Sequence, residues 1–572
     1  MRTEAAETTE HGLNEAVEGG RPIPHGDASS AYTDWPGLLA GDWEAWRRKL
    51  GRSKGGPRVL IATGVGGWAH IAMVDSLIGV ALTLRGAEVH VLLCDGVLSA
   101  CEFLTIHDSP LESFAEKGAP AERCSACYAN AARMYQDLGL TVHGYGDFLT
   151  DTVIQEASCL SWTMPVEQLT DYAVNGVRVG EHALAGALRF FAVGTLDNEP
   201  YAEPVLRRYL HAAILACHAI RQCLATRCFA STSFHHGIYV PQGVLGDVAR
   251  IMGVRVVNWV VAYRKKSFIF SHGDTYHHTM MSEPVSAWEQ MDWSDQHESD
   301  IMDYLQSRRK GERDWIWFHE RPEENTDRIV QETGIDLDRP MIGLLTNVIW
   351  DAQLHYPANA FPDMLSWVNQ TIRYFETRPD LQLVIRIHPA ELRGTVKSRQ
   401  LIATEIENAF PRLPKNVFVV SPDSRISTYA LTSLCNAVII YGTKTGVELT
   451  SFGIPVIVAG EAWIRNKGVT FDASSPDEYI ELLDNLPFLS SLDDATKKRA
   501  RKYAYHFFFR RMIPIQSISP LQGWPPYGLT ANRLDDLLEG RDLGVDIICN
   551  GILNGTEFIY PAEALRNPMV DP

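Results

Sequence analysis

The chain lacks the features that would place it in a membrane or on nucleic acid. It has no uninterrupted apolar run of the roughly 18–20 residues that a membrane span needs. Its 70 acidic residues outnumber 52 basic ones, for a net charge of −18, so we expect no basic face for nucleic-acid phosphates. Because residues 1–27 are polar and carry no apolar core, we expect no secretory signal and a cytoplasmic location.

Cysteine is also scarce, with ten residues in a chain of 572, which excludes a small disulfide-held scaffold. Four of the ten nevertheless form a pattern in which two thiols precede a C-x-x-C pair: Cys94, Cys101, Cys124 and Cys127. Four thiolates suit a structural zinc ion or an iron–sulfur cluster. The spacing is not that of a standard zinc finger, and buried reduced thiols or a disulfide are the alternatives.

What the sequence does contain is alternation of strand-like and helical segments, in two stretches of the chain. Each stretch predicts a parallel sheet covered by helices, and a chain of this length exceeds one hydrophobic core. We therefore expect an α/β protein with two Rossmann-like domains facing across a cleft. The expected segments are a partly disordered tail at 1–50, a first domain at 51–285, a helical connector at 286–338, a second domain at 339–490 and a helical extension at 491–572.

The first domain offers few groups for chemistry. Its predicted strands lie at 58–67, 88–94, 227–237 and 254–261. Gly66 and Gly67 end the first of them, where glycine lets a ligand approach the backbone or simply permits a tight turn. His236 ends the third strand and would face the cleft. We assign these three residues to the acceptor side of a site.

The second domain carries polar residues after each of its five predicted strands, at 340–346, 381–387, 417–420, 437–440 and 455–458. Open α/β sheets bind ligands at the carboxyl ends of their strands. We therefore predict that a donor molecule is bound and processed there by a set of strand-end residues. The set is Asn347, Asp351, Arg386, His388, Pro389, Glu391, Ser424, Gly442, Thr443, Lys444, Thr445, Glu448 and Glu461.

Each residue type in this set suits one task. Backbone N–H groups at 442–445, with the two threonine hydroxyls and the Lys444 charge, can bind a phosphate. His388, on a strand exit that Pro389 stiffens, can donate to a phosphate or a leaving oxygen. Glu448 can accept from ribose hydroxyls, and Asp351 can take a proton from an attacking hydroxyl. The alternatives are an ordinary loop histidine at 388 and a turn or helix-capping role for Asp351.

Four motifs in this stretch resemble the capsule polysaccharide biosynthesis proteins, a family that includes bacterial glycosyltransferases using CMP-Kdo. They are Arg-Ile-His-Pro-Ala-Glu at 386–391, Pro-Asp-Ser-Arg-Ile-Ser-Thr-Tyr at 422–429, Tyr-Gly-Thr-Lys-Thr-Gly-Val-Glu-Leu at 441–449 and Gly-Ile-Pro-Val-Ile-Val-Ala-Gly at 453–460. The resemblance covers about 340–485 and implies the GT-B architecture of two facing Rossmann-like domains.

The resemblance also implies residue roles. His388 would contact the donor phosphate, residues 443–445 would hold that phosphate or the donor carboxylate, and Asp351 would be the general base. No metal or other cofactor would be needed for the chemical step. The family's base segment reads Gln-x-x-x-Asp-Ala-Ser, whereas residues 347–353 read Asn-Val-Ile-Trp-Asp-Ala-Gln, and these two departures leave the donor sugar open.

The sequence thus predicts a glycosyltransferase. It would move a sugar, of which acidic Kdo is one candidate, from a CMP- or other nucleotide-sugar donor to a glycan or small-molecule acceptor in surface polysaccharide or related glycoconjugate biosynthesis. The alternatives are a nucleotide-sugar epimerase or glycerophosphotransferase on the same fold, and a non-catalytic assembly partner. A basic and aromatic patch at 506–511 either packs on the first domain or makes a peripheral membrane contact.

Overall fold

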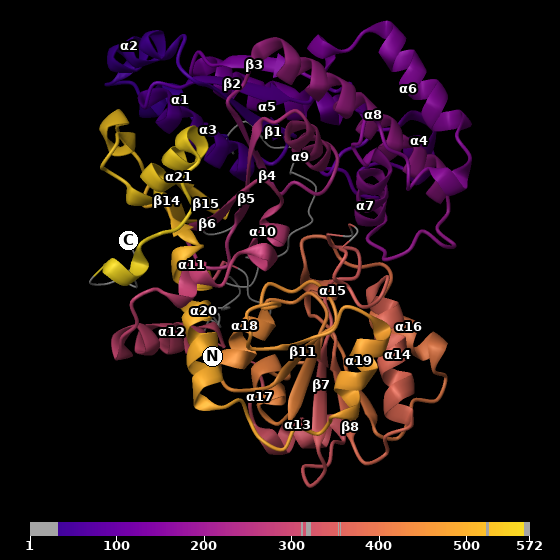
Figure 1. The fold of residues 1–572 in the computed structure, drawn as a ribbon. Coiled ribbons are helices and arrows are strands. Elements are labelled where there is room, and N and C mark those ends of the chain that lie inside the picture. The colour runs from indigo at the N-terminus through magenta and orange to yellow at the C-terminus, as the bar shows by residue number, and fades with distance from the viewer. Residues whose placement is uncertain are drawn as a thin grey trace, which may run out of the picture.

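The computed structural model describes residues 32–309, 313–315, 322–352, 354, 356–521 and 526–565. Two sheets organise the chain, one in each half of the molecule, and helices cover both (Figure 1). This confirms the prediction of an α/β protein with two Rossmann-like domains. The part of the predicted tail at 1–31 lies outside the described residues.

The first sheet has the strand order β13-β6-β5-β4-β1-β2-β3. The strands β1 to β5 are parallel to one another, whereas β6 is antiparallel to β5 and β13 is antiparallel to β6. Their bounds are β1 Arg58–Gly64, β2 Glu88–Leu93, β3 Thr141–Gly144, β4 Ser231–His235, β5 Arg255–Val261, β6 Ser267–His272 and β13 Ile513–Pro514. The helices α3 Ala69–Leu84, α5 Ala121–Asp137, α7 Val179–Phe191, α8 Ala202–Arg227 and α9 Gln242–Ile251 belong to this domain.

The second sheet is parallel throughout, with the order β12-β11-β10-β7-β8-β9. Its strands are β7 Met341–Leu345, β8 Gln382–Arg386, β9 Val417–Val420, β10 Ala437–Ile440, β11 Val456–Val458 and β12 Phe471–Asp472. Short apolar runs such as 437–440 form these strands because both faces of a helix-covered parallel sheet are buried. The helices include α14 Met364–Glu376, α15 Ala390–Arg393, α16 Ile402–Ala409, α17 Thr428–Ser433, α18 Thr445–Ser451 and α19 Pro476–Asp484.

Both sheets reverse their strand order at a central pair. In the second sheet the chain moves outward from β7 through β8 to β9, and then returns to the other side of β7 to place β10, β11 and β12. In the first sheet β1 and β4 form the corresponding pair. Such a switch point is where open α/β sheets bind ligands, outside the carboxyl ends of the two strands.

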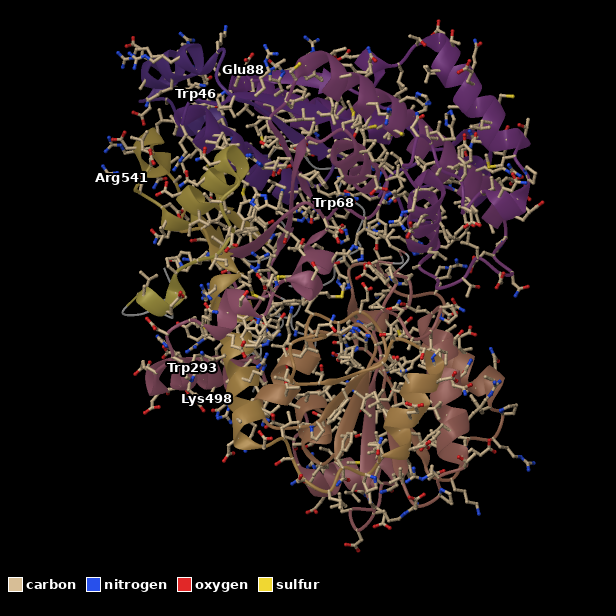
Figure 2. All side chains as sticks on the ribbon, in the orientation of Figure 1. Trp46, Trp68, Glu88, Trp293, Lys498 and Arg541 are labelled. Atoms are coloured by element: carbon tan, nitrogen blue, oxygen red, sulfur yellow. The ribbon has the colours of Figure 1, made fainter. Side chains whose placement is uncertain are left out.

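The helices α11 Ser286–Glu289, α12 Asp295–Arg308 and α13 Thr326–Thr333 lie in the predicted connector. Helix α12 packs against α20, Asp494–Tyr505, at the junction of the domains. Figure 2 labels Trp293 and Lys498 there, and the Trp293 ring meets Tyr505 edge-on at 5.8 Å.

After α20 the chain returns to the first domain, where β13 joins the sheet and α21, Leu543–Asn554, packs against α3 (Figure 1). The phenylalanines Phe507, Phe508 and Phe509 of the basic and aromatic patch are fully buried. This patch therefore packs inside the protein. Across the described residues, no helix is both long and apolar enough to cross a membrane.

Residues 32–50, which the sequence assigns to the tail, contain α1, Trp35–Leu38, and the start of α2, Trp43–Ser53. Trp46 is buried, and its indole N–H donates to the Leu138 carbonyl at 2.8 Å (Figure 2). The structure thus attaches this part of the chain to the first domain.

Candidate functional site

At the switch point of the second sheet, a hydrogen bond joins the loop after β7 to the loop after β10. The Asn347 side-chain oxygen, after β7, accepts from the Gly442 N–H, after β10, at 3.3 Å. Beside it the Thr443 and Thr445 hydroxyls lie 3.1 Å apart, and the Thr445 N–H donates to Thr443 at 3.3 Å. Since α18 spans only seven residues, a ligand here would depend on the N–H and hydroxyl groups of residues 442–445 more than on a helix dipole.

His388 follows β8 in an orientation that fixes its tautomer. Its backbone N–H donates to the Thr346 hydroxyl at 3.0 Å, and its ring Nδ1 accepts from the Ala390 N–H at 3.1 Å. Burial, helped by the charges of Lys444 and Arg386, lowers the pKa of His388 to about 4. The ring is therefore neutral at pH 7 with its proton on Nε2, which makes Nε2 a hydrogen-bond donor.

Asp351 is tied to the opposite domain. The Tyr239 hydroxyl, in the loop between β4 and α9, donates to Asp351 Oδ1 at 2.8 Å and accepts from the Ala352 N–H at 2.9 Å. The His236 ring stacks on Tyr239 at 5.2 Å. Burial lowers the pKa of His236 to about 4, while Asp351 acts in the opposite direction. The predicted base and the predicted acceptor-side histidine thus meet at one place.

Aromatic side chains that sequence reasoning missed fill the space around this contact. Burial, followed by the Asp351 charge, raises the pKa of Tyr276. Burial also raises the pKa of Tyr263, and the Asp351 charge adds to this rise. The Lys444 ammonium lies 4.6 Å from the centre of the Tyr263 ring. These contacts connect the phosphate-binding candidates to Asp351. The available signal was the concentration of His and Tyr at 235–239 and 276–278.

Glu461, a predicted donor-binding residue, lies at a second contact between the domains. Its carboxylate accepts from the Ala358 N–H at 2.9 Å and approaches His278 Nε2 at 3.5 Å, and its carbonyl accepts from the His277 ring at 3.1 Å. Both histidines belong to α10, Tyr276–Ser282, of the first domain. The contacts of Glu461 therefore serve the domain junction.

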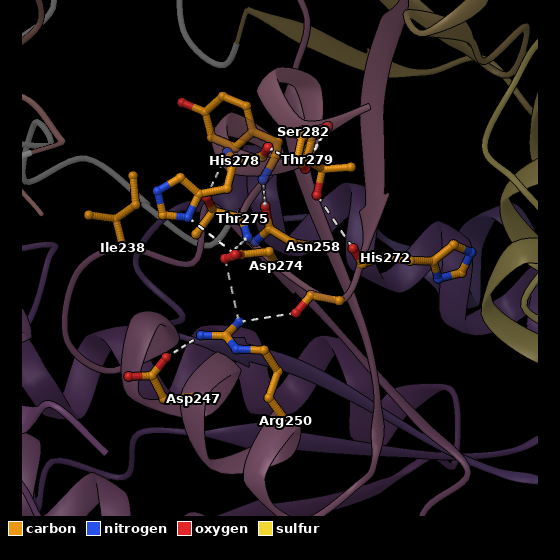
Figure 3. A network of polar contacts seen from close by, with 12 residues as sticks. Ile238, Asp247, Arg250, Asn258, His272, Asp274, Thr275, His278, Thr279 and Ser282 are labelled. Atoms are coloured by element: carbon orange, nitrogen blue, oxygen red, sulfur yellow. Dashed lines mark hydrogen bonds and ion pairs between the residues drawn. The ribbon is translucent and has the colours of Figure 1, made fainter. Parts of the chain in front are cut away.

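The His278 contact continues into the first domain as a chain of alternating charges (Figure 3). His278 Nδ1 lies 3.2 Å from Asp274, and Arg250 lies 3.8 Å from Asp274 and also pairs with Asp247. Although burial lowers it, the hydrogen bond and charge of Asp274, with the charge of Glu461, raise the pKa of His278. When protonated, the ring bridges acidic groups of the two domains.

Three predicted donor-binding side chains contact protein groups. Arg386, 2% exposed, donates to the carbonyls of Ser421 and Ser424. The Ser424 hydroxyl donates to Glu332 at 2.6 Å. Buried Glu391 accepts from the Ile402 N–H at 3.3 Å, and burial raises its pKa to about 7. These residues hold the strand-end loops in shape, and Pro389 occupies the start of the short α15.

Glu448 is fully buried in an ionic cluster, which does not fit the predicted contact with ribose hydroxyls. Lys444 Nζ donates to its carboxylate at 2.8 Å, Arg308 lies at 3.3 Å and the Tyr429 hydroxyl also donates to it. Burial opposes ionisation, yet Arg308 and Lys444 lower the pKa of Glu448 to about 2. Because Arg308 also pairs with Asp314, the cluster joins α18 to the connector.

A cavity of about 730 Å³ is lined by residues of both domains. Thr195, Asp197 and Glu199 line it from the first domain, and Arg399 and Gln400 from the second. Arg399 pairs with Glu199 at 2.8 Å, and Gln400 accepts from the Gly194 N–H at 2.8 Å.

The four patterned cysteines line a different and smaller cavity, within the first domain. Gly66 and Gly67, predicted to face the cleft, pack against this region. A Cβ on Gly66 would lie 2.4 Å from the Cys127 carbonyl oxygen, and one on Gly67 would lie 2.4 Å from the Phe103 ring. Their small size is therefore needed for packing. No three His, Cys, Asp or Glu side chains among the described residues are placed to hold a single metal ion.

Residues 341–482 match the family model described as capsule polysaccharide biosynthesis protein. No curated protein sequence matches the chain. Solved structures that resemble it include KpsC, the β-Kdo 2,4-transferase of Thermosulfurimonas dismutans, with 12% identity, a TM-score of 0.33 and coverage of 54% of this chain and 88% of that one.

The UDP-GlcNAc 2-epimerase of Neisseria meningitidis also resembles it, with 10% identity, a TM-score of 0.25 and coverage of 78% and 94%. Likenesses this weak say nothing of function. The family match covers the strand-end loops that contain His388, the 442–445 turn and Asp351. Residues 341–482 of the second domain thus resemble the capsule polysaccharide biosynthesis proteins, as the motifs in this stretch predict.

Proposed function

We propose that the protein is a glycosyltransferase that moves a sugar from a nucleotide-sugar donor to a hydroxyl of a glycan or small-molecule acceptor in surface polysaccharide or related glycoconjugate biosynthesis. One observation carries the proposal. The loop after β7 contacts the 442–445 turn through Asn347 and contacts the opposite domain through the Asp351–Tyr239 pair. A single loop thus connects a donor-phosphate cradle with a carboxylate at the acceptor side.

The donor phosphate binds at the switch point in this proposal. The N–H groups and hydroxyls of residues 442–445 face it, and His388 donates from Nε2. Lys444 adds positive charge, although its ammonium is held by Glu448 at 2.8 Å. A neutral imidazole N–H that is already oriented stabilises a developing phosphate charge without reorganisation of its surroundings.

The acceptor hydroxyl oxygen attacks the anomeric carbon of the donor sugar in the chemical step. Asp351 takes the hydroxyl proton, and the bond between the anomeric carbon and the phosphate oxygen breaks. The electron pair of that bond leaves with the nucleotide, whose phosphate the 442–445 turn and His388 stabilise. Tyr239 keeps one Asp351 oxygen in place, and contact between the domains limits the access of water.

Binding of nucleotides to the purified protein tests the donor half. We expect one of CMP, CDP, UDP and GDP to raise the melting temperature. At a hundredfold excess over Kd, the nucleotide should increase the free energy of unfolding by about 3 kcal/mol. Thr443→Val and His388→Ala should each weaken that shift. Failure of all four nucleotides to stabilise the wild-type protein would overturn the proposed donor site.

Product analysis with nucleotide sugars, CMP-Kdo among them, tests the reaction. Asp351→Asn should abolish transfer while the nucleotide-induced shift in melting temperature persists. The matched control is Asp484→Asn, because Asp484 accepts a tyrosine hydroxyl hydrogen bond at the same distance of 2.8 Å on the surface. Transfer that continues in EDTA would agree with metal-independent chemistry. An epimerised donor, or free sugar formed without dependence on an acceptor, would overturn the transferase.

A further inference from the structure

Four cysteines converge on one small cavity in the first domain, although they come from three segments of the chain. Cys94 directly follows β2, Cys101 lies in the next loop, and Cys124 and Cys127 occupy the first two turns of α5. The cavity, of about 20 Å³, is otherwise lined by apolar side chains and Arg123. Cys124 and Cys127 lie on one face of their helix because residues three apart are neighbours there.

Burial raises the pKa of Cys94, Cys101 and Cys127, and backbone N–H groups act in the opposite direction at each of these sulfur atoms. They are those of Gly66 and Gly67 at Cys127, Gly96 and Leu98 at Cys94, and Phe103 at Cys101. Such N–H groups stabilise thiolates, and hydrogen bonds to sulfur are one means by which proteins tune iron–sulfur clusters. The close approach needs glycine at 66, where a Cβ would meet the Cys127 carbonyl oxygen at 2.4 Å.

Arg123 supplies positive charge at the rim of the cavity. Its guanidinium lies 4.6 Å from the Phe103 ring centre and pairs with Asp108 at 2.8 Å. Its buried Nε has no hydrogen-bond partner among the described residues. A cationic group in this position would offset the negative charge of several thiolates.

The arrangement distinguishes among the ways in which four cysteines can be used. All four are free thiols, so no disulfide joins them. A single zinc ion needs its thiolates to converge at about 2.3 Å from the metal, whereas the described residues contain no group of three ligands placed for one ion. An iron–sulfur cluster instead distributes its thiolates over several iron atoms, and four cysteines that line one cavity suit this arrangement.

We propose that this cavity binds an iron–sulfur cluster through the thiolates of Cys94, Cys101, Cys124 and Cys127. Each thiol loses its proton and becomes the ligand of one iron atom. The cluster would thereby cross-link the end of β2, the loop at 95–104 and α5.

The cross-linked loop leads to the domain junction. The backbone N–H of Glu102, next to Cys101, donates to the Val240 carbonyl at 2.9 Å, and the Glu102 carbonyl accepts from Arg189. Arg189 in turn lies 5.4 Å from the ring centre of Tyr239, which holds Asp351. The cluster thus has a structural role in supporting the first-domain side of the candidate site, and this role rests on the proposed function, whereas binding of the cluster does not.

The full-length protein, purified without exposure to oxygen, tests the proposal. We expect iron and acid-labile sulfide in equal amounts, near four of each per chain, with the visible absorption of an iron–sulfur cluster. Cys101→Ser and Cys124→Ser should each lose most of both, because a serine hydroxyl is a poor substitute for a thiolate. Cys159→Ser is the matched control, since Cys159 is exposed on α6, Asp151–Thr163, and should retain the wild-type content.

Reconstitution of the wild-type apoprotein with sulfide and equal amounts of ferrous and ferric iron provides a second measurement if the variants fail to fold. It should restore the absorption and raise the melting temperature of the same preparation. One zinc per chain without sulfide, a disulfide between any two of the four cysteines, or four reactive thiols with no bound metal would each overturn the proposal. The iron and sulfide content does not depend on nucleotide binding. This measurement therefore tests the cluster even if the glycosyltransferase proposal fails.

Discussion

At the scale of single residues, Tyr239 is the side chain that the proposed chemistry most needs besides its reacting groups. It belongs to the first domain but fixes the carboxylate of the second, through hydrogen bonds of 2.8 and 2.9 Å to Asp351 and Ala352. We predict that Tyr239→Phe lowers kcat about tenfold, the effect of roughly 1.4 kcal/mol in the transition state. Because the Tyr239 hydroxyl bonds to Asp351 and Ala352, which are not among the proposed phosphate-binding groups, KM for the donor should change little. Steady-state kinetics with varied donor measures both.

The control for this substitution is Tyr374→Phe. Tyr374 also donates to an aspartate, Asp484, at 2.8 Å, but on the outer surface of the second domain. It should leave kcat and KM unchanged. A rise in donor KM without a fall in kcat for Tyr239→Phe would contradict a role in positioning the base.

Glu391 gives a prediction about stability. Burial raises its pKa to about 7, above the ordinary 4.5. The folded state therefore favours the protonated acid, and the wild-type protein loses stability as pH rises from about 4.5 to about 7. Glu391→Gln, which keeps an oxygen for the Ile402 N–H, should match the wild type at pH 4.5 and exceed its stability by up to about 3 kcal/mol at pH 8. Melting temperatures of the wild type and of Glu391→Gln at pH 4.5 and pH 8 test this prediction. Equal melting temperatures of the two proteins at pH 8 would contradict the raised pKa of Glu391.

Residue positions at the site were easier to predict than residue partners. The rule that ligands bind at strand ends located Asn347, His388 and Thr443 correctly at the carboxyl edge of the sheet. It could not separate them from Arg386 and Glu448, which occupy the same edge. The partners of those two are distant in sequence, such as Arg308 for Glu448, and a motif does not contain them.

At the scale of elements, the ionic cluster around Glu448 attaches helix α18 to helix α12. Both Arg308 and Glu448 are buried, at 4% and 0% side-chain exposure. Removal of one partner of a buried ion pair leaves an uncompensated charge and costs about 3 kcal/mol or more. Glu448→Gln should therefore lower the melting temperature by several degrees. Glu407→Gln, on the exposed face of α16, should not, and equal melting temperatures for the two variants would contradict a structural role for the cluster.

The central strands were predictable, and the edge strands were not. The sequence predicted β1, β2, β4 and β5, short strands whose residues are mostly buried, as expected of a sheet covered on both faces. By contrast, β3 has four residues at a sheet edge and is not among the predicted strands. Strand β13 has two residues and pairs with β6, so that Ile513 lies opposite Phe268, far away in the sequence. Such pairings form between segments that are far apart in the sequence, and a local sequence pattern does not contain that information.

At the scale of the whole molecule, the alternation of strands and helices predicted two domains, but the way in which they meet came only from the structure. The junction uses Tyr239, several histidines and a buried ionic cluster. Lys444 and Glu448 of this cluster belong to the 441–449 motif, but their partner Arg308 lies outside every motif. The C-terminal extension contributes as well, because it crosses from α20 back to the first sheet. A chain arranged in this way connects the two domains at more than one point.

His278 makes this junction sensitive to pH. Its ring faces Asp274 at 3.2 Å and Glu461 at 3.5 Å, and Arg250 is the nearby charge that opposes protonation. The pKa of His278 is raised in the folded protein, so its contribution to stability is fully present below about pH 6.5 and is lost as pH rises through the folded value. We therefore predict that His278→Gln lowers the melting temperature at pH 6 and has a much smaller effect at pH 9. The exposed His107 is the control, because His107→Gln should produce no difference that depends on pH. A destabilisation by His278→Gln that stays constant or grows toward pH 9 would mean that the neutral ring makes the contact, and that the ion pair does not hold the domains together.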